Sequence, residues 1–371
     1  MVGLNILWFA LILMFLVLVH EAGHMVVAKW CGMRVERFSI FFGRPIAAFR
    51  RGETQYAIGW LPLGGYVKIS GMTRGEDIPP EVEPRAYYNA PVWRRIATIL
   101  AGPAVNIVLA VIIFAAIFWI GVPTARITDT VGQVGQGTAA AQMDLRPGDR
   151  IVAIDGTRVQ GDPARVRKAL QAGAPGDPVT VTVARDGSAV ELEGERAVLR
   201  DISGEPVADP VTGEPLAGLG FTFEVVEGPT RSYGLVGGLE RGLDFTWFIV
   251  KTNGEVLGDV FTSSEARGQV SSIVGIGAVF NEVSDDGLIT LLRFVGVISL
   301  ALGLFNLLPI LPLDGGHILF ALIEKVKGSA LSRTTYERAS FVGLALLMVV
   351  FVVALQNDIG RITGEGFRVD P

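Results

Sequence analysis

The sequence predicts a multi-pass α-helical membrane protein with four transmembrane helices, a cytosolic β-hairpin region at the membrane and an extracytoplasmic β-rich α+β domain. Hydrophobic residues make up 50% of its 371 residues, and the mean hydropathy is +0.45, well above what a soluble domain of this length needs for its core. The apolar residues gather in stretches of about 20 residues or more, long enough to cross ~30 Å of hydrocarbon. These stretches are residues 4–28, 97–121, 287–308 and 338–356.

The first apolar stretch contains an HExxH motif, His20-Glu21-Ala22-Gly23-His24. On a helix, His20 and His24 lie one turn apart on one face, so both imidazoles can bind one Zn²⁺ while Glu21 acts on water. In a soluble helix two histidines near a glutamate would be a weak signal. Inside a bilayer such side chains are costly and are usually paired or ligated, so this placement favours a metal site.

The loop that follows, residues 30–96, is basic and β-rich. Between Lys29 and Arg95 there are eleven Lys/Arg and six Asp/Glu, a net charge of +5. Residues 35–40 and 55–60 predict strands, with turn residues at 43–45 and 64–65. Cys31 is the only cysteine in the chain, so neither an intramolecular disulfide nor a cysteine-ligated metal is expected.

Charge asymmetry predicts the orientation of the chain in the membrane. Residues 122–286 carry fourteen Lys/Arg and twenty-four Asp/Glu, a net charge of −10. Because cytosolic loops carry the excess of Lys and Arg, we expect residues 30–96 and 322–337 to be cytosolic and residues 122–286 to be extracytoplasmic. The overall charge of −5 gives no reason to expect a nucleic-acid partner.

Within the acidic segment, residues 131–183 resemble a PDZ domain. The resemblance rests on a small-residue helix, a Pro147-Gly148-Asp149 turn and a strand-turn ending at Asp155-Gly156. A second helix at 162–171 and a Val/Thr strand at 178–184 are expected to follow. Such domains add an extended peptide to a sheet edge, so this unit would bind a peptide or protein ligand, or would exclude substrates with a large outer domain. Residues 233–256 read as an amphipathic segment on the membrane surface.

The third apolar stretch ends in a second polar cluster, Asn306-Leu-Leu-Pro-Ile-Leu-Pro-Leu-Asp314-Gly-Gly-His317. Its prolines and glycines predict a local break in the helix, which membranes tolerate only where backbone is buried or lines a cavity. An aspartate at that depth is costly unless it meets a cation. Asp314 is therefore expected to complete the site of His20 and His24, leaving a fourth position open as in catalytic zinc sites. We expect His317 to lie beside the ligands or at the membrane interface rather than to bind the metal.

Taken together, these motifs resemble the site-2 protease family of zinc intramembrane proteases. The resemblance rests on HEAGH at 20–24, Gly-Tyr-Val-Lys at 65–68, Ala-Gly-Pro-Ala-Val-Asn at 101–106 and the string from Asn306 to Gly316. It implies zinc ligation by His20, His24 and Asp314, with Glu21 as the general base. It also implies that Asn306 holds substrate backbone, although a polar cap at the helix break is an equal alternative.

The resemblance further implies a function and a place in the cell. We expect a zinc-dependent endopeptidase of the bacterial inner membrane that cleaves single-span proteins already trimmed on the outer side, such as anti-sigma factors in stress response or remnant signal peptides. The strand edge of the cytosolic loop would pair with unwound substrate, or would only anchor the helices. The alternatives are a non-catalytic membrane PDZ adaptor and a gluzincin-type peptidase with a glutamate as third ligand.

These expectations divide the chain into nine segments. The predicted transmembrane segments are 1–29 with the HExxH motif, 97–121, 287–321 with the LDGG motif, and 338–357. The predicted segments between and beyond them are the cytosolic loop 30–96, the PDZ domain 122–200, its C-terminal region with the amphipathic helix 201–286, the cytosolic connection 322–337 and the tail 358–371.

Overall fold

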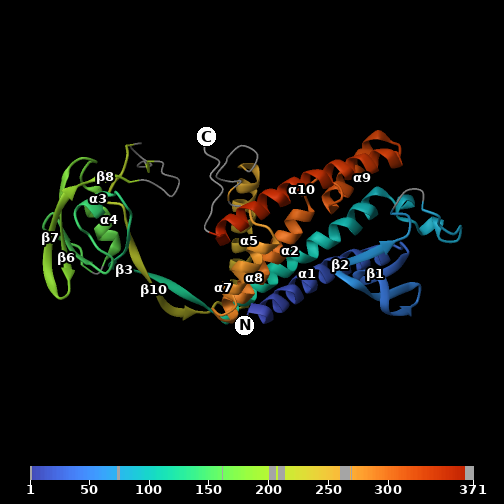
Figure 1. Cartoon of the computed structure of the whole chain (residues 1–371), viewed down its shortest axis with the longest axis horizontal. Coiled ribbons are helices and arrows are strands. Elements are labelled where there is room, and N and C mark those ends of the chain that lie inside the picture. Colours follow the sequence, from blue (N-terminus) through green and yellow to red (C-terminus); the bar gives the residue numbers. More distant parts are fainter. Residues whose placement is uncertain are drawn as a thin grey trace. The chain divides into compact units, whose positions relative to one another are not determined.

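The computed structural model describes residues 2–72, 76–160, 162–199, 206–207, 214–259, 268 and 270–363. The chain forms two compact units, one made of Met1–Gly121 with Ser232–Pro371 and the other of Val122–Arg231. Figure 1 shows that the first unit is mainly helical and the second mainly β. The sequence-predicted site residues all belong to the first unit.

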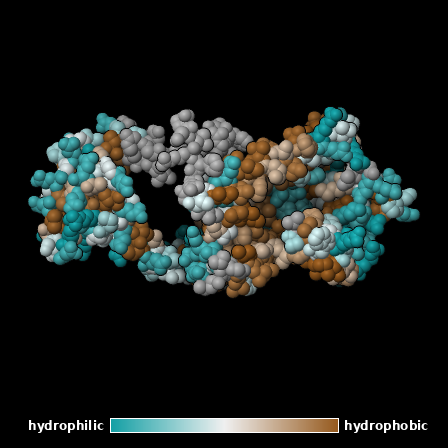
Figure 2. Space-filling model, viewed as in Figure 1, coloured by the Kyte–Doolittle hydropathy of each residue, from teal (hydrophilic) through white to brown (hydrophobic). Residues whose placement is uncertain are grey.

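Four helices among the described residues are long and apolar enough to cross a membrane. They are α1 (Val2–Trp30), α2 (Val92–Ile120), α8 (Leu288–Asn306) and α10 (Arg333–Thr363). Large apolar side chains are exposed along them, and Figure 2 shows hydrophobic surface over this unit. In water such a surface would be unfavourable, but in a bilayer it meets lipid. The helices α2 and α10 extend beyond the predicted apolar stretches because a helix continues into polar residues outside hydrocarbon.

The helix α2 is the centre of the first unit. It packs against α1, α5 (Leu235–Asp259), α8 and α9 (Asp314–Lys327). A Cβ atom at Gly23 of α1 would lie 2.6 Å from the carbonyl oxygen of Ala101 in α2. Only glycine therefore allows this close approach of the two backbones, as small residues commonly do between membrane helices.

In the described residues between the second unit and the third span, the chain forms the helices α5 and α7 (Ile273–Val283). The helix α5 begins at residue 235 and so covers residues 235–256 of the predicted amphipathic segment 233–256. The helix α7 was not predicted, because it is too short to read as a span and too apolar to read as amphipathic. Its first turn is capped by Asp358 of α10, which accepts hydrogen bonds from the backbone N–H groups of Ser272 and Gly275.

The loop that was predicted to be cytosolic forms a sheet from two long strands, β1 (Val35–Arg51) and β2 (Thr54–Ile69). The register shows that residues 37–40 lie beside both 65–68 and 55–58. The predicted turn residues therefore lie inside assigned strands, at places where the strands bend. Gly43 has a φ of 88° and Gly64 a φ of 112°, which favours glycine. Two short 3₁₀ helices, Glu83–Arg85 and Tyr87–Asn89, lead into α2.

In its described residues the second unit is a sheet with two helices. The elements are β3 (Val122–Val134), α3 (Ala139–Gln142), β4 (Arg150–Ile154), β5 (Thr157–Arg158), α4 (Pro163–Gln171), β6 (Pro178–Arg185), β7 (Ser188–Glu195), β8 (Ala197–Val198), β9 (Ala217–Gly218) and β10 (Phe221–Arg231). The strand order is β10-β3-β4-β6-β7, with β5 paired to β4 and a separate β8-β9 pair. The hydrophobic core includes Ile151, Val166 and Val181.

This second unit extends beyond residue 200, where its end was predicted. The strand β10 pairs with β3 at the start of the unit, from Phe221 opposite Val134 to Arg231 opposite Val122. A strand so far along the chain from its partner leaves no local sequence signal of that pairing. The helix predicted at 162–171 and the strand predicted at 178–184 correspond to α4 and β6.

Candidate metal centre

The two histidines of the HExxH motif lie one turn apart on α1 and face the interior of the helical unit. His20 is 6% exposed and His24 is 4% exposed. Their Nε2 atoms are 3.2 Å apart, and the rings meet edge to face at 82°. The stretch is rich in Leu, Ala and Met, which favour a helix, and the spacing of four places both imidazoles on one side.

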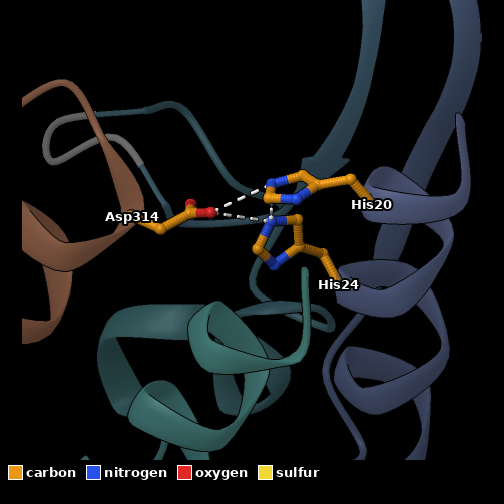
Figure 3. A group of neighbouring side chains, drawn as sticks. All are labelled: His20, His24 and Asp314. Atoms are coloured by element: carbon orange, nitrogen blue, oxygen red, sulfur yellow. Dashed lines mark hydrogen bonds and ion pairs between the residues drawn. The ribbon is translucent and has the colours of Figure 1, made fainter. Parts of the chain in front are cut away.

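Asp314 reaches the same point from the opposite side, as Figure 3 shows. Its Oδ2 atom lies 3.0 Å from Nε2 of His20 and 3.3 Å from Nε2 of His24. Asp314 is the first residue of α9 and follows the non-helical residues 307–313. At Gly315 a Cβ atom would lie 2.1 Å from the carbonyl oxygen of Leu307, so glycine is needed for α9 to fold back against this break.

The donor set of these three side chains fits a zinc ion. One ligand atom from each of His20, His24 and Asp314 lies within 4.8 Å of the other two. Zinc accepts imidazole nitrogen and carboxylate oxygen at about 2.0–2.2 Å, in tetrahedral geometry. Three protein ligands leave one of the four tetrahedral positions free, which is the pattern of catalytic rather than structural zinc sites.

Glu21 lies beside this triad and contacts the sheet formed by β1 and β2. Its Oε2 atom accepts a hydrogen bond from the backbone N–H of Val67 in β2 at 3.0 Å. The position of a Cβ atom on Gly65 would be 3.6 Å from Cγ of Glu21. The strand segment 65–68 therefore runs past the carboxylate.

Lys68 of the same segment forms two ion pairs that stabilise the sheet. Its Nζ atom pairs with Glu36 at 2.7 Å and with Glu76 at 2.9 Å. The hydrogen bonds to these two carboxylates hold the pKa of Lys68 above its usual value. Lys68 is therefore charged at neutral pH and ties the edge segment of the sheet to its neighbours.

The helix α2 supplies contacts that the sequence analysis did not predict. The Nδ1 atom of His24 lies 2.9 Å from the carbonyl oxygen of Thr98, and Nδ1 of His20 lies 3.5 Å from Nδ2 of Asn106. A Cβ atom at Gly102 would lie 2.2 Å from Nε2 of His24. Asn106 did carry a signal, since a buried amide inside an apolar span marks a functional position by default.

The structure does not bring Asn306 or His317 into the triad. Nδ2 of Asn306 donates to the carbonyl oxygen of Leu302 in its own helix at 2.9 Å, which is the polar cap considered as an alternative. The ring of His317 lies 6.5 Å from that of Tyr336. Among the described residues the group able to hold a metal contains only His20, His24 and Asp314.

Comparison with known proteins shows similarity over nearly the whole chain. The model of peptidase family M50 matches residues 8–350. A Rhizobium meliloti (strain 1021) protein named "Putative zinc metalloprotease R01501" is 32% identical over 367 residues, covering 96% of each chain. The regulator of sigma-E protease RseP of Salmonella typhimurium (strain 14028s) is 30% identical over 455 residues, covering 97% of this chain and 100% of that protein.

One solved structure is also similar to part of the chain. The crystal structure of the PDZ domain of an SdrC-like protein from Listeria monocytogenes is 20% identical, with a TM-score of 0.21. It covers 28% of this chain and 93% of that one, and at this TM-score it carries no conclusion about the fold. The family match and the relatives similar over nearly the whole length show that this chain belongs to peptidase family M50, the site-2 protease family, and the prediction of a zinc metalloprotease is confirmed at the level of that family.

Proposed function

We propose that this chain is a zinc-dependent endopeptidase that cleaves transmembrane segments of single-span proteins inside the membrane. The observation that carries the proposal is that His20 and His24, on a helix apolar enough to cross a bilayer, converge with Asp314. Hydrolysis consumes water, which is scarce inside a bilayer. A hydrolytic site at that depth is explained if the substrate is itself a membrane helix.

Each polar side chain of the site has a role in peptide hydrolysis. His20 and His24 would hold the metal through Nε2, and Asp314 would hold it through Oδ2. When bound, zinc supplies a Lewis acid that makes water more acidic and polarises the substrate carbonyl. Glu21 takes a proton from the attacking water as the new C–O bond forms, and then gives that proton to the amide nitrogen as the C–N bond breaks.

The edge segment 65–68 of β2 would hold the substrate in an extended form. A transmembrane helix satisfies its own backbone hydrogen bonds, so cleavage requires unwinding and new partners for the freed N–H and C=O groups. The N–H of Val67 points at Glu21 rather than at β1, which means that this edge of the sheet faces the carboxylate. Pairing by strand addition would place a peptide bond beside Glu21.

Asn306 remains a proposed contact for substrate backbone. Its side chain is engaged with the carbonyl oxygen of Leu302, so a substrate carbonyl would have to take its Nδ2 from that partner. Such an exchange costs little, because Leu302 lies four residues before Asn306 in α8 and its carbonyl oxygen keeps the backbone N–H of Asn306 as its helical partner.

The charge distribution supports an orientation with the metal centre near the cytosolic side of a bacterial inner membrane. The basic residues 30–96 would be cytosolic, and the unit Val122–Arg231, which we propose to be a PDZ domain, would be extracytoplasmic. That domain would bind a peptide or would restrict entry to trimmed substrates. Similarity to a regulator of sigma-E protease supports membrane anti-sigma factors as one substrate class.

The zinc content of purified variants tests the proposal. We expect about one zinc per native chain and loss of that zinc in Asp314→Ala, because two imidazoles without the carboxylate form an incomplete site. The matched control is His317→Ala, which changes the third histidine, three residues further along α9, and should keep the metal. Full zinc in Asp314→Ala would refute the assignment of the third ligand and would favour a glutamate elsewhere.

A further inference from the structure

The Nδ1 atoms of the two site histidines have different kinds of neighbour on α2. Nδ1 of His24 faces the carbonyl oxygen of Thr98 at 2.9 Å, and a carbonyl can only accept. Nδ1 of His20 faces the carboxamide of Asn106, with Nδ2 at 3.5 Å. Asn106 is fully buried, and its Oδ1 atom has no hydrogen-bond partner in the described part of the chain. A buried polar atom without a partner costs about 1–3 kcal/mol, so it demands a reason.

Metal binding places a definite demand on the Nδ1 atoms. A neutral imidazole that offers the lone pair of Nε2 carries its proton on Nδ1, and this N–H needs an acceptor. For His24 the carbonyl oxygen of Thr98 is this acceptor. The contact of His20 with Nδ2 of Asn106 fits the tautomer that is protonated on Nε2. In that tautomer Nε2–H donates to Oδ2 of Asp314 at 3.0 Å and Nδ1 accepts from the amide.

We propose that the carboxamide of Asn106 supports His20 in both tautomers by turning over when the metal binds. Without metal, Nδ2 donates to Nδ1 of His20. With metal at Nε2, the carboxamide is rotated by about 180° about Cβ–Cγ, and its Oδ1 accepts the proton of Nδ1–H. The imidazole stays neutral, since it loses a proton at Nε2 and gains one at Nδ1. This inference rests on the proposed ligation of zinc by His20 and makes Asn106 a positioning residue.

The two orientations of the carboxamide are close in free energy. Its nitrogen and oxygen are nearly equal in size, so the rotation changes little in the packing. In the orientation described, Oδ1 is the amide atom without a partner, and after rotation Nδ2 would take its place. The tautomer of His20 therefore decides which orientation is favoured, and in this way the metal controls it.

The backbone of Asn106 is fixed while its side chain turns. The hydroxyl of Ser299 in α8 donates to the carbonyl oxygen of Asn106 at 2.8 Å, and Ser299 is fully buried. A Cβ atom at Gly303 would lie 2.9 Å from the carbonyl oxygen of Pro103, so α8 and α2 are in close backbone contact here. The helix pair thus presents the amide to His20 at a constant distance.

The direct test observes the proton on His20. The chain has three histidines, so labelling histidine with ¹⁵N gives three imidazoles, and variants of His24 and His317 assign them. In the native protein without metal we expect His20 protonated on Nε2. After zinc loading we expect protonation on Nδ1, with a short contact between that proton and Cγ of Asn106. Protonation on Nδ1 in both states would overturn the proposal.

Zinc affinity, measured by competition with a chelator, gives a second readout. Asn106→Leu has a similar volume but no acceptor, so we expect affinity to fall by about 10- to 100-fold. Asn106→Asp, which restores an acceptor, should recover it. The control Ser299→Ala removes a buried hydrogen bond at the same helix contact and should keep native affinity.

The outcomes separate this inference from the function on which it rests. If Asn106→Leu and Ser299→Ala lose zinc affinity equally, Asn106 acts through helix packing, and the inference is overturned. Native affinity in Asn106→Leu would overturn it as well. A native chain that binds no zinc would instead refute the proposed function. If Asn106→Leu does not fold, the spectra of the native protein still decide.

Discussion

Gly102 is the residue on which the space for the histidine pair depends most directly. A Cβ atom there would lie 2.2 Å from Nε2 of His24 and 2.8 Å from Nε2 of His20. Both contacts are far inside van der Waals distance, and they involve the atoms that we propose bind zinc. Because α2 also meets α1 closely at Gly23, the helices have no room to move apart locally without losing that packing.

We therefore expect Gly102→Ala to lose zinc while the chain still inserts and folds as a helical protein. The added methyl group displaces the imidazoles, and binding then falls because ligand positions matter to within about 0.5 Å. Bound zinc is measured by elemental analysis of the purified variant. Gly254→Ala in α5 is the control, since nothing lies within 4 Å of a Cβ atom there. Native zinc content in Gly102→Ala would contradict the geometry described here.

At this scale the sequence predicted the residues whose chemistry is unusual for their surroundings. His20, His24 and Asp314 are ionisable groups in apolar stretches, and the structure brings them together. Gly102 and the carbonyl of Thr98 could not be predicted, because their importance depends on where α2 crosses α1. Asn306 was predicted to contact substrate, and that role remains a prediction, since its amide bonds to Leu302.

At the scale of elements, a buried ion pair fastens α9 to α2. Nη1 of Arg95 lies 2.7 Å from Oε2 of Glu324, and the two side chains are 8% and 5% exposed. Glu324 is ten residues beyond Asp314 on α9. The same helix therefore carries the third proposed ligand at its start and this anchor near its end, so the pair fixes the direction in which α9 leaves the site.

Breaking this pair should destabilise the helical unit. We expect Glu324→Met alone to cost about 3–5 kcal/mol, because Arg95 would be left buried with an uncompensated charge. The double variant Arg95→Met with Glu324→Met should cost less than the sum of the single variants, since it removes both charges. Denaturant unfolding in detergent measures the three variants. Additive effects in this cycle would show that the two side chains do not interact as described.

The elements themselves were predictable to different degrees. The long apolar runs predicted α1, α2, α8 and α10, and the prolines predicted the break at 307–313. The helix α7 was missed because its 11 residues are fewer than a span requires. The pairing of β10 with β3 was missed because contacts between strands distant in sequence leave no periodic signal in either strand.

At the scale of the whole molecule, the charge distribution predicts an orientation in the membrane. Cys31 is the only native cysteine and is 8% exposed, so single cysteines introduced elsewhere can be labelled with little background. Thr157→Cys in the second unit should react with a membrane-impermeant maleimide on intact cells. Ala48→Cys in β1 should react only after the inner membrane is opened. The opposite pattern would contradict the proposed orientation and place the metal centre near the other side.

The central claim is that the triad and Glu21 hydrolyse a peptide bond. It is tested most directly by incubating a tagged single-span reporter in detergent with the native chain and with Glu21→Gln, while bound zinc is quantified in both. The variant removes the proton acceptor but none of the three proposed ligands. We predict that the native chain cuts the reporter, and that Glu21→Gln keeps its zinc but loses cleavage by at least about 100-fold. Cleavage by Glu21→Gln at the native rate would contradict the account.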